Sequence, residues 1–110
     1  MKKDNLAYIE DVLEACERIL SYTDGVEFAR LEEDQMLVDA IVRNIEVIGE
    51  AANRLGDDFK TSHPNFPIRS AVTMRNKLIH DYNMIDYVVV WDTVRNDIPE
   101  LQKTCQQLLK

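Results

Sequence analysis

The 110-residue chain has few of the residues that interrupt helices or cross-link a fold. It contains only three glycines, three prolines and two cysteines. All-β domains need many turns and use more glycine and proline, so this composition favours a helical protein. Two cysteines are too few for a disulfide framework. Both lie at apolar positions of helical patterns, and we interpret Cys16 and Cys105 as reduced, buried side chains.

The sequence also lacks long apolar runs. Its longest aromatic and aliphatic run covers residues 87–91, which is far too short to span a membrane. Residues 1–4 are followed by acids rather than by an apolar stretch, which excludes a signal peptide. We therefore expect a cytoplasmic protein without membrane contact. A chain of this length fits one domain, so residues 1–110 are expected to form a single helical domain.

The spacing of apolar residues predicts an all-α bundle of four or five helices. Residues 57–66 are expected to form a connection that can hold one helical turn. Asp4 and Asp86 can cap the first and fourth helices. The second helix is apolar on more than one face, which is typical of a helix at the centre of a bundle or shared with a partner chain. Helices are expected over residues 4–22, 32–55, 67–81 and 87–96, with a fifth segment after a break or kink at Pro99.

The net charge of −7 is unevenly distributed along the chain. Residues 59–80 contain four cations and no acid, whereas the segments on either side are acidic. Phosphate affinity comes from clustered cations, so the total charge argues against an ordinary nucleic-acid or DNA binder, and only this window remains a candidate. Chance and helix placement are the alternative explanation. The window contains Lys60, Arg69, Arg75 and Lys77 together with the two histidines, His63 and His80.

Several common catalytic patterns are missing. The two histidines have no cysteine or carboxylate at ligand spacing beside them, so we expect no metal site and no cofactor. The sequence has no glycine-rich phosphate loop and no nucleotidyltransferase motif. Metal-dependent nuclease and nucleotide-transfer activities are therefore poorly supported for this chain alone.

The densest polar segment covers residues 75–82 at the end of the third predicted helix. Asn76 and His80 are four residues apart and would stack on one helical face. Arg75 and His80 are five apart, about 140° around an ideal helix. Either the long Arg75 side chain reaches around the helix, or the helix ends or distorts at His80.

These residue types suit cleavage of RNA without a metal. RNA carries its own nucleophile, the 2′-hydroxyl, so the protein must supply proton transfer and positive charge. Histidine can accept or donate a proton near neutral pH, and arginine presents a planar fork to phosphate oxygens. One such histidine per chain is too few for both proton transfers, and a symmetric dimer would supply two. The structural alternative is that Arg75 pairs with an acid, His80 ends a helix and Tyr82 packs in the core.

The pattern Arg-x-x-x-x-His-x-Tyr, formed by Arg75, His80 and Tyr82, resembles the motif of the HEPN superfamily in its HepT-like toxin branch. Together with further similar blocks, the resemblance extends over nearly the whole chain. The sequence differs from the usual family pattern at Thr73, Ile68 and Asn83, and none of these differences removes a catalytic residue type. The similar blocks are residues 8–15, 42–52, 90–94 and 97–101.

The resemblance implies a cytoplasmic, metal-independent ribonuclease toxin of a prokaryotic toxin–antitoxin pair. It implies a homodimeric helical bundle with a cleft between two motifs, in which Arg75 and His80 are catalytic. Asn76 is expected to support them because of its four-residue spacing from His80. The implied partner is a minimal nucleotidyltransferase antitoxin that attaches AMP to Tyr82. Two alternatives stay open: a non-catalytic nucleotide-binding or scaffold subunit for such a transferase, favoured by the acidic bulk of the chain, and a purely structural helical adaptor.

Overall fold

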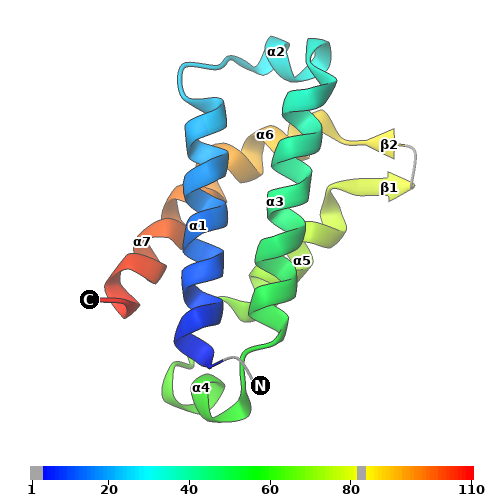
Figure 1. The fold of residues 1–110 in the computed structure, drawn as a ribbon. Coiled ribbons are helices and arrows are strands. Elements are labelled where there is room, and N and C mark those ends of the chain that lie inside the picture. The colour runs from blue at the N-terminus through cyan, green and yellow to red at the C-terminus, as the bar shows by residue number, and fades with distance from the viewer. Residues whose placement is uncertain (1–3, 82–83) are drawn as a thin grey trace.

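Two long helices, α1 and α3, lie side by side and form the centre of the molecule (Figure 1). The computed structural model describes residues 4–81 and 84–110. The all-α class predicted from the sequence is confirmed, with one short two-stranded ribbon added to it. In chain order the elements are α1 (Asn5–Thr23), α2 (Phe28–Glu33), α3 (Gln35–Asn53), α4 (Asp57–Ser62), α5 (Ile68–Lys77), β1 (Ile79–Asp81), β2 (Met84–Ile85), α6 (Tyr87–Asp92), the π-helical segment η1 (Thr93–Asp97) and α7 (Ile98–Leu108).

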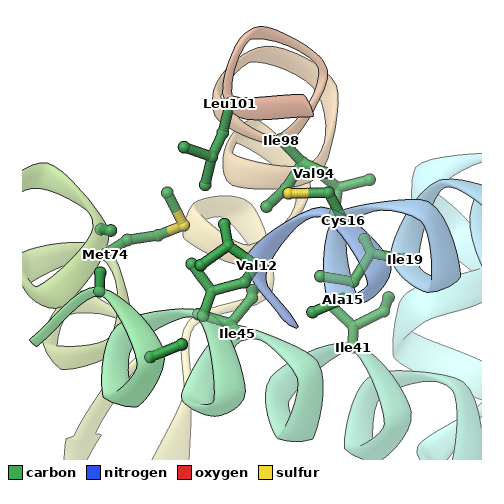
Figure 2. Close-up of a cluster of buried hydrophobic side chains, with 14 of the residues drawn as sticks. Val12, Ala15, Cys16, Ile19, Ile41, Ile45, Met74, Val94, Ile98 and Leu101 are labelled. Carbon is green, nitrogen blue, oxygen red and sulfur yellow. The ribbon is translucent and has the colours of Figure 1, made fainter. Parts of the chain in front are cut away.

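The core lies where α1 and α3 meet α5, η1 and α7. Because α3 packs against both α1 and α5, it needs apolar residues on more than one face, as its sequence indicates. The predicted apolar stripes are largely buried, but Leu6 in the first turn of α1 is 54% exposed. Figure 2 shows the meeting point, where the labelled side chains are Val12, Ala15, Cys16, Ile19, Ile41, Ile45, Met74, Val94, Ile98 and Leu101.

Aspartate caps set the starts of three helices. The Asp4 carboxylate accepts a hydrogen bond from the Ala7 amide at 2.9 Å, which confirms the predicted start of α1. Asp86 caps α6 in the same way. Asp34 accepts from the Leu37 amide at 3.1 Å and starts α3 three residues later than predicted. The residues before this cap form the separate helix α2, which the apolar spacing did not reveal.

The C-terminal part of the chain is helical throughout, although three consecutive valines favour strands. These valines lie in α6, as predicted. The break expected at Pro99 takes the form of the π-helical segment η1, in which the Ile98 amide donates to the Thr93 carbonyl. Pro99 itself lies in the first turn of α7, where its missing N–H is not needed.

The prediction that the third helix runs to residue 81 is wrong, because α5 ends at Lys77. Beyond Leu78 the chain enters β1, which pairs with β2 in antiparallel fashion, with Ile79 opposite Ile85. The Asp86 amide donates to the Leu78 carbonyl at 3.1 Å and closes the base of this ribbon. Local strand pairing thus ends the helix at a point where the apolar spacing would have allowed it to continue.

Candidate functional site

Arg75 lies in the last turn of α5, half-buried against α3. Its Nε donates a long hydrogen bond, 3.4 Å, to Oδ1 of Asn76. Both residues border a hollow of about 410 Å³ between the two helices. Sequence analysis missed the α3 side of this hollow, because its residues are far from the motif along the chain. The lining residues are Val42, Arg43, Glu46, Glu50, Arg75, Asn76 and Leu78.

Two carboxylates of α3 line the hollow, and each is paired with an arginine, one within α3 and one directly after its end. Glu50 lies 3.0 Å from Arg54, and Glu46 lies 3.9 Å from Arg43. Exposed pairs of this kind contribute about 0–1 kcal/mol to stability, so their main effect is to orient the carboxylates. Arg75 forms no ion pair with any side chain that the structure describes. Among these residues, nothing supports the alternative in which Arg75 serves to pair with an acid.

The backbone of His80 lies beyond the end of α5, within β1. Of the two arrangements open to Arg75 and His80, the structure adopts the one in which the helix ends before the histidine. The prediction that Asn76 and His80 stack on one helical face is therefore wrong. Tyr82 lies outside the described residues, so its proposed role stays a prediction.

The ribbon that carries His80 extends from the bundle beside the end of α5 (Figure 1). A two-stranded ribbon alone is only marginally stable in water. Here both ends of the ribbon are attached to the fold, because Leu78 is fully buried and Asp86 both bonds to its carbonyl and caps α6. The motif thus spans a helix end and an anchored ribbon.

A larger hollow, about 550 Å³, lies on the other side of α5, against η1 and α7. It contains neither Arg75 nor Asn76 in its lining. Two cations of the basic window, Arg69 and Lys77, face it together with Asp97 and Glu100. These opposite charges balance, so this hollow offers no clear attraction for a polyanion. The charges that line the smaller hollow balance as well, with Arg43 and Arg75 against Glu46 and Glu50. Arg75 is the better candidate for a phosphate contact because it belongs to the motif and, unlike Arg43, forms no ion pair with a described side chain.

The other histidine and the two cysteines pack against the core rather than lining either hollow. The His63 ring stacks on Phe59 with ring centroids 4.4 Å apart. Burial raises the pKa of both Cys16 and Cys105 to about 12, so both thiols are protonated at neutral pH. This agrees with their interpretation as reduced, buried side chains. Over the described ranges, no three His, Cys, Asp or Glu residues gather as metal ligands would. No helix there has the length and apolarity needed to cross a membrane.

Comparison with known proteins gives a consistent family match. Residues 12–108 match the family model described as "Ribonuclease HepT-like". The chain is 40% identical over its full length to the whole of a Thermococcus cleftensis protein named "Probable ribonuclease HepT". It is 35% identical over 99% of its length to 90% of a Methanocaldococcus jannaschii protein named "Putative RNase". A Caldanaerobacter subterraneus protein of the same description is 36% identical, with 94% of this chain and 92% of the relative covered. No protein of solved structure matches.

Proposed function

Because the chain belongs to the HepT-like ribonuclease family, we propose that it cleaves RNA without a metal, using Arg75 and His80. The observation that supports this most directly is the end of α5 between the two residues. Arg75 remains on the helix, at a hollow open to solvent, and forms no ion pair with a described side chain. The histidine follows on a separate element. The two residues are therefore not held about 140° apart, as five residues along an ideal helix would be.

The proposed reaction is an internal transfer within RNA. The 2′-oxygen attacks the adjacent phosphorus and loses its proton to a histidine acting as base. The new 2′-O–P bond forms while the bond from phosphorus to the 5′-oxygen breaks, which leaves a 2′,3′-cyclic phosphate. The departing 5′-oxygen takes a proton from an acid. Arg75 would stabilise the extra negative charge on the phosphate oxygens as the transition state forms.

We expect the purified chain to cleave single-stranded RNA in the presence of excess EDTA. The proposed reaction takes its nucleophile from the substrate and its charge stabilisation from Arg75, so chelation should not lower the rate. The measurement is gel analysis of a labelled oligonucleotide with and without EDTA. A DNA oligonucleotide of the same sequence is the control, because it lacks the 2′-hydroxyl and should stay intact. Activity that disappears with EDTA and returns with Mg²⁺ would contradict the mechanism.

The two proton transfers lead to a prediction about assembly. Each chain has a single motif histidine, so we propose that two copies join with α5 near the twofold axis and that His80 of each serves one cleft. Light scattering at micromolar concentration should give twice the chain mass. A monomer that cleaves RNA at full rate would exclude the shared site.

We further propose that the protein is the toxin of a toxin–antitoxin pair, neutralised by a nucleotidyltransferase that modifies Tyr82. The family membership supports this role, and the sequence carries no transferase motif of its own, so that activity would lie in a partner. The alternative is a non-catalytic subunit that scaffolds the transferase or holds a nucleotide. It is favoured by the net charge of −7 and by the two glutamates beside Arg75. The EDTA-resistant cleavage described above separates the two functions.

A further inference from the structure

Gly49 lies on the face of α3 that contacts Arg75. Among the residues that the structure describes, only Gly25 has a positive φ. The backbone conformation of Gly49 therefore does not require glycine. Glycine weakens a helix relative to alanine, so a glycine inside α3 points to a need for space. A Cβ at this position would lie 3.4 Å from both Cβ and Cδ of Arg75, and 3.5 Å from the Ala71 carbonyl oxygen.

These distances show what the missing side chain allows. A methyl group would be in van der Waals contact with Arg75 and Ala71, so a larger side chain that extends toward α5 would have to displace the Arg75 stem or the α5 backbone. The aliphatic part of Arg75 instead lies against the bare backbone of α3. The same side chain lines the hollow that Glu46 and Glu50 also line, and its Nε donates to Oδ1 of Asn76. A long, flexible side chain loses many alternative rotamers when its stem packs against a neighbouring helix.

We propose that Gly49 is a positioning residue for RNA cleavage, because it keeps open the space that holds the Arg75 stem in one orientation. The inference rests on the ribonuclease function proposed above. Preorganising a charged group before the substrate arrives lowers the cost of ordering it during the reaction. Gly49 would therefore act on RNA only through Arg75, and its replacement should have no effect on RNA once Arg75 is gone.

The first test needs no RNA. Gly49→Ala, Gly49→Ser and Gly49→Leu add side chains of increasing size, and Ala40→Leu is the matched control. Ala40 is half-buried on the same helix, about 180° around it from Gly49. Thermal unfolding is measured with Arg75 present and in the Arg75→Ala background. Gly49→Leu should lower Tm clearly when Arg75 is present and much less when the stem has been removed, because leucine can then use that space. Ala40→Leu should give equal changes in both backgrounds.

The second test measures binding of single-stranded RNA in a His80→Ala background, which removes cleavage. Gly49→Leu should weaken binding roughly tenfold at low salt. It should also reduce the slope of log K against log salt concentration by about 0.7, the value for one phosphate contact on a single strand. In Arg75→Ala protein it should change neither quantity. Gly49→Ala and Gly49→Ser add smaller side chains beside Arg75 and should weaken binding less than Gly49→Leu, in the order of side-chain size.

The outcomes separate the two proposals. The positioning role is overturned if folded Gly49→Leu binds RNA with the parent's affinity and salt slope. It is equally overturned if Gly49→Leu weakens binding by the same factor with and without Arg75, since the effect would then come from the fold. A parent protein that neither binds nor cleaves RNA overturns the ribonuclease function, and this role with it. Normal RNA cleavage without coupling between Gly49 and Arg75 overturns the positioning role alone.

Discussion

We expect Arg75→Ala and His80→Ala each to lose RNA cleavage by a factor of roughly 100 to 10,000 while the protein stays folded. His80 would transfer protons in the transition state, and Arg75 would stabilise charge that develops on the phosphate. Both effects should lower kcat more than they raise KM, because the interactions strengthen as the reaction proceeds. The measurement is steady-state cleavage of a labelled RNA, with circular dichroism and thermal unfolding to confirm the fold.

Two matched variants control for loss of charge and loss of a ring. Arg69→Ala removes an exposed arginine from the same helix as Arg75, on the side of the larger hollow. It should change cleavage by a few-fold at most, through weaker RNA binding. His63→Ala removes a histidine that stacks on Phe59, so its cost should appear in Tm rather than in kcat. A folded Arg75→Ala or His80→Ala protein with full activity would show that the residue is not catalytic.

Asn76 should have a smaller effect than either residue. Its side chain accepts the long Arg75 hydrogen bond from its exposed position at the end of α5. It does not share a helical face with His80, because the two residues belong to different elements. Its contribution would be to orient Arg75, and a few-fold decrease in kcat for Asn76→Ala fits a hydrogen bond of 3.4 Å.

The sequence predicts those parts of the fold that depend on local signals. Asp4 and Asp86 were identified as helix caps because a carboxylate near free amides is a local pattern. The end of α5 could not be predicted in this way. Leu78 and Ile79 continue a helical spacing, and only the pairing of Ile79 with Ile85 shows that the chain has left the helix. This boundary depends on pairing with a residue six positions further along the chain, which the apolar spacing of the helix does not reveal.

The candidate site shows the same limit. Arg75 and His80 stand out in the sequence because their residue types suit phosphate chemistry. The surface that packs against the Arg75 stem belongs to α3, and the residue in contact there is Gly49. A glycine has no side chain whose chemistry would point to this role. One local signal was available, since a glycine inside a long apolar helix needs a reason. The sequence does not show that Arg75 occupies the space beside Gly49, because that contact exists only through the packing of α3 against α5.

The largest regulatory effect is expected at Tyr82. We propose that a partner nucleotidyltransferase transfers AMP from ATP to its phenolic oxygen. The tyrosine oxygen would form a bond to the α-phosphorus, pyrophosphate would leave, and the phenolic proton would pass to a base of the transferase. The added phosphodiester carries a negative charge two residues from His80 and would compete with RNA for Arg75. The bulk of the nucleotide would also fill space needed by the RNA strand, so the modified protein should lose RNA cleavage altogether.

The measurement is mass spectrometry of the protein co-expressed with the proposed partner transferase. AMP additions should map to Tyr82, and the modified protein should be inactive after the transferase is removed. Tyr82→Phe is the matched control, because it keeps the ring and lacks the accepting oxygen. It should remain unmodified, and it should stay active in the presence of the transferase if its own cleavage activity is intact. Loss of RNA cleavage in co-expressed protein whose Tyr82 is unmodified would exclude the covalent switch. Inhibition would then require the partner to remain bound and block the cleft, and it would be lost on separating the two proteins.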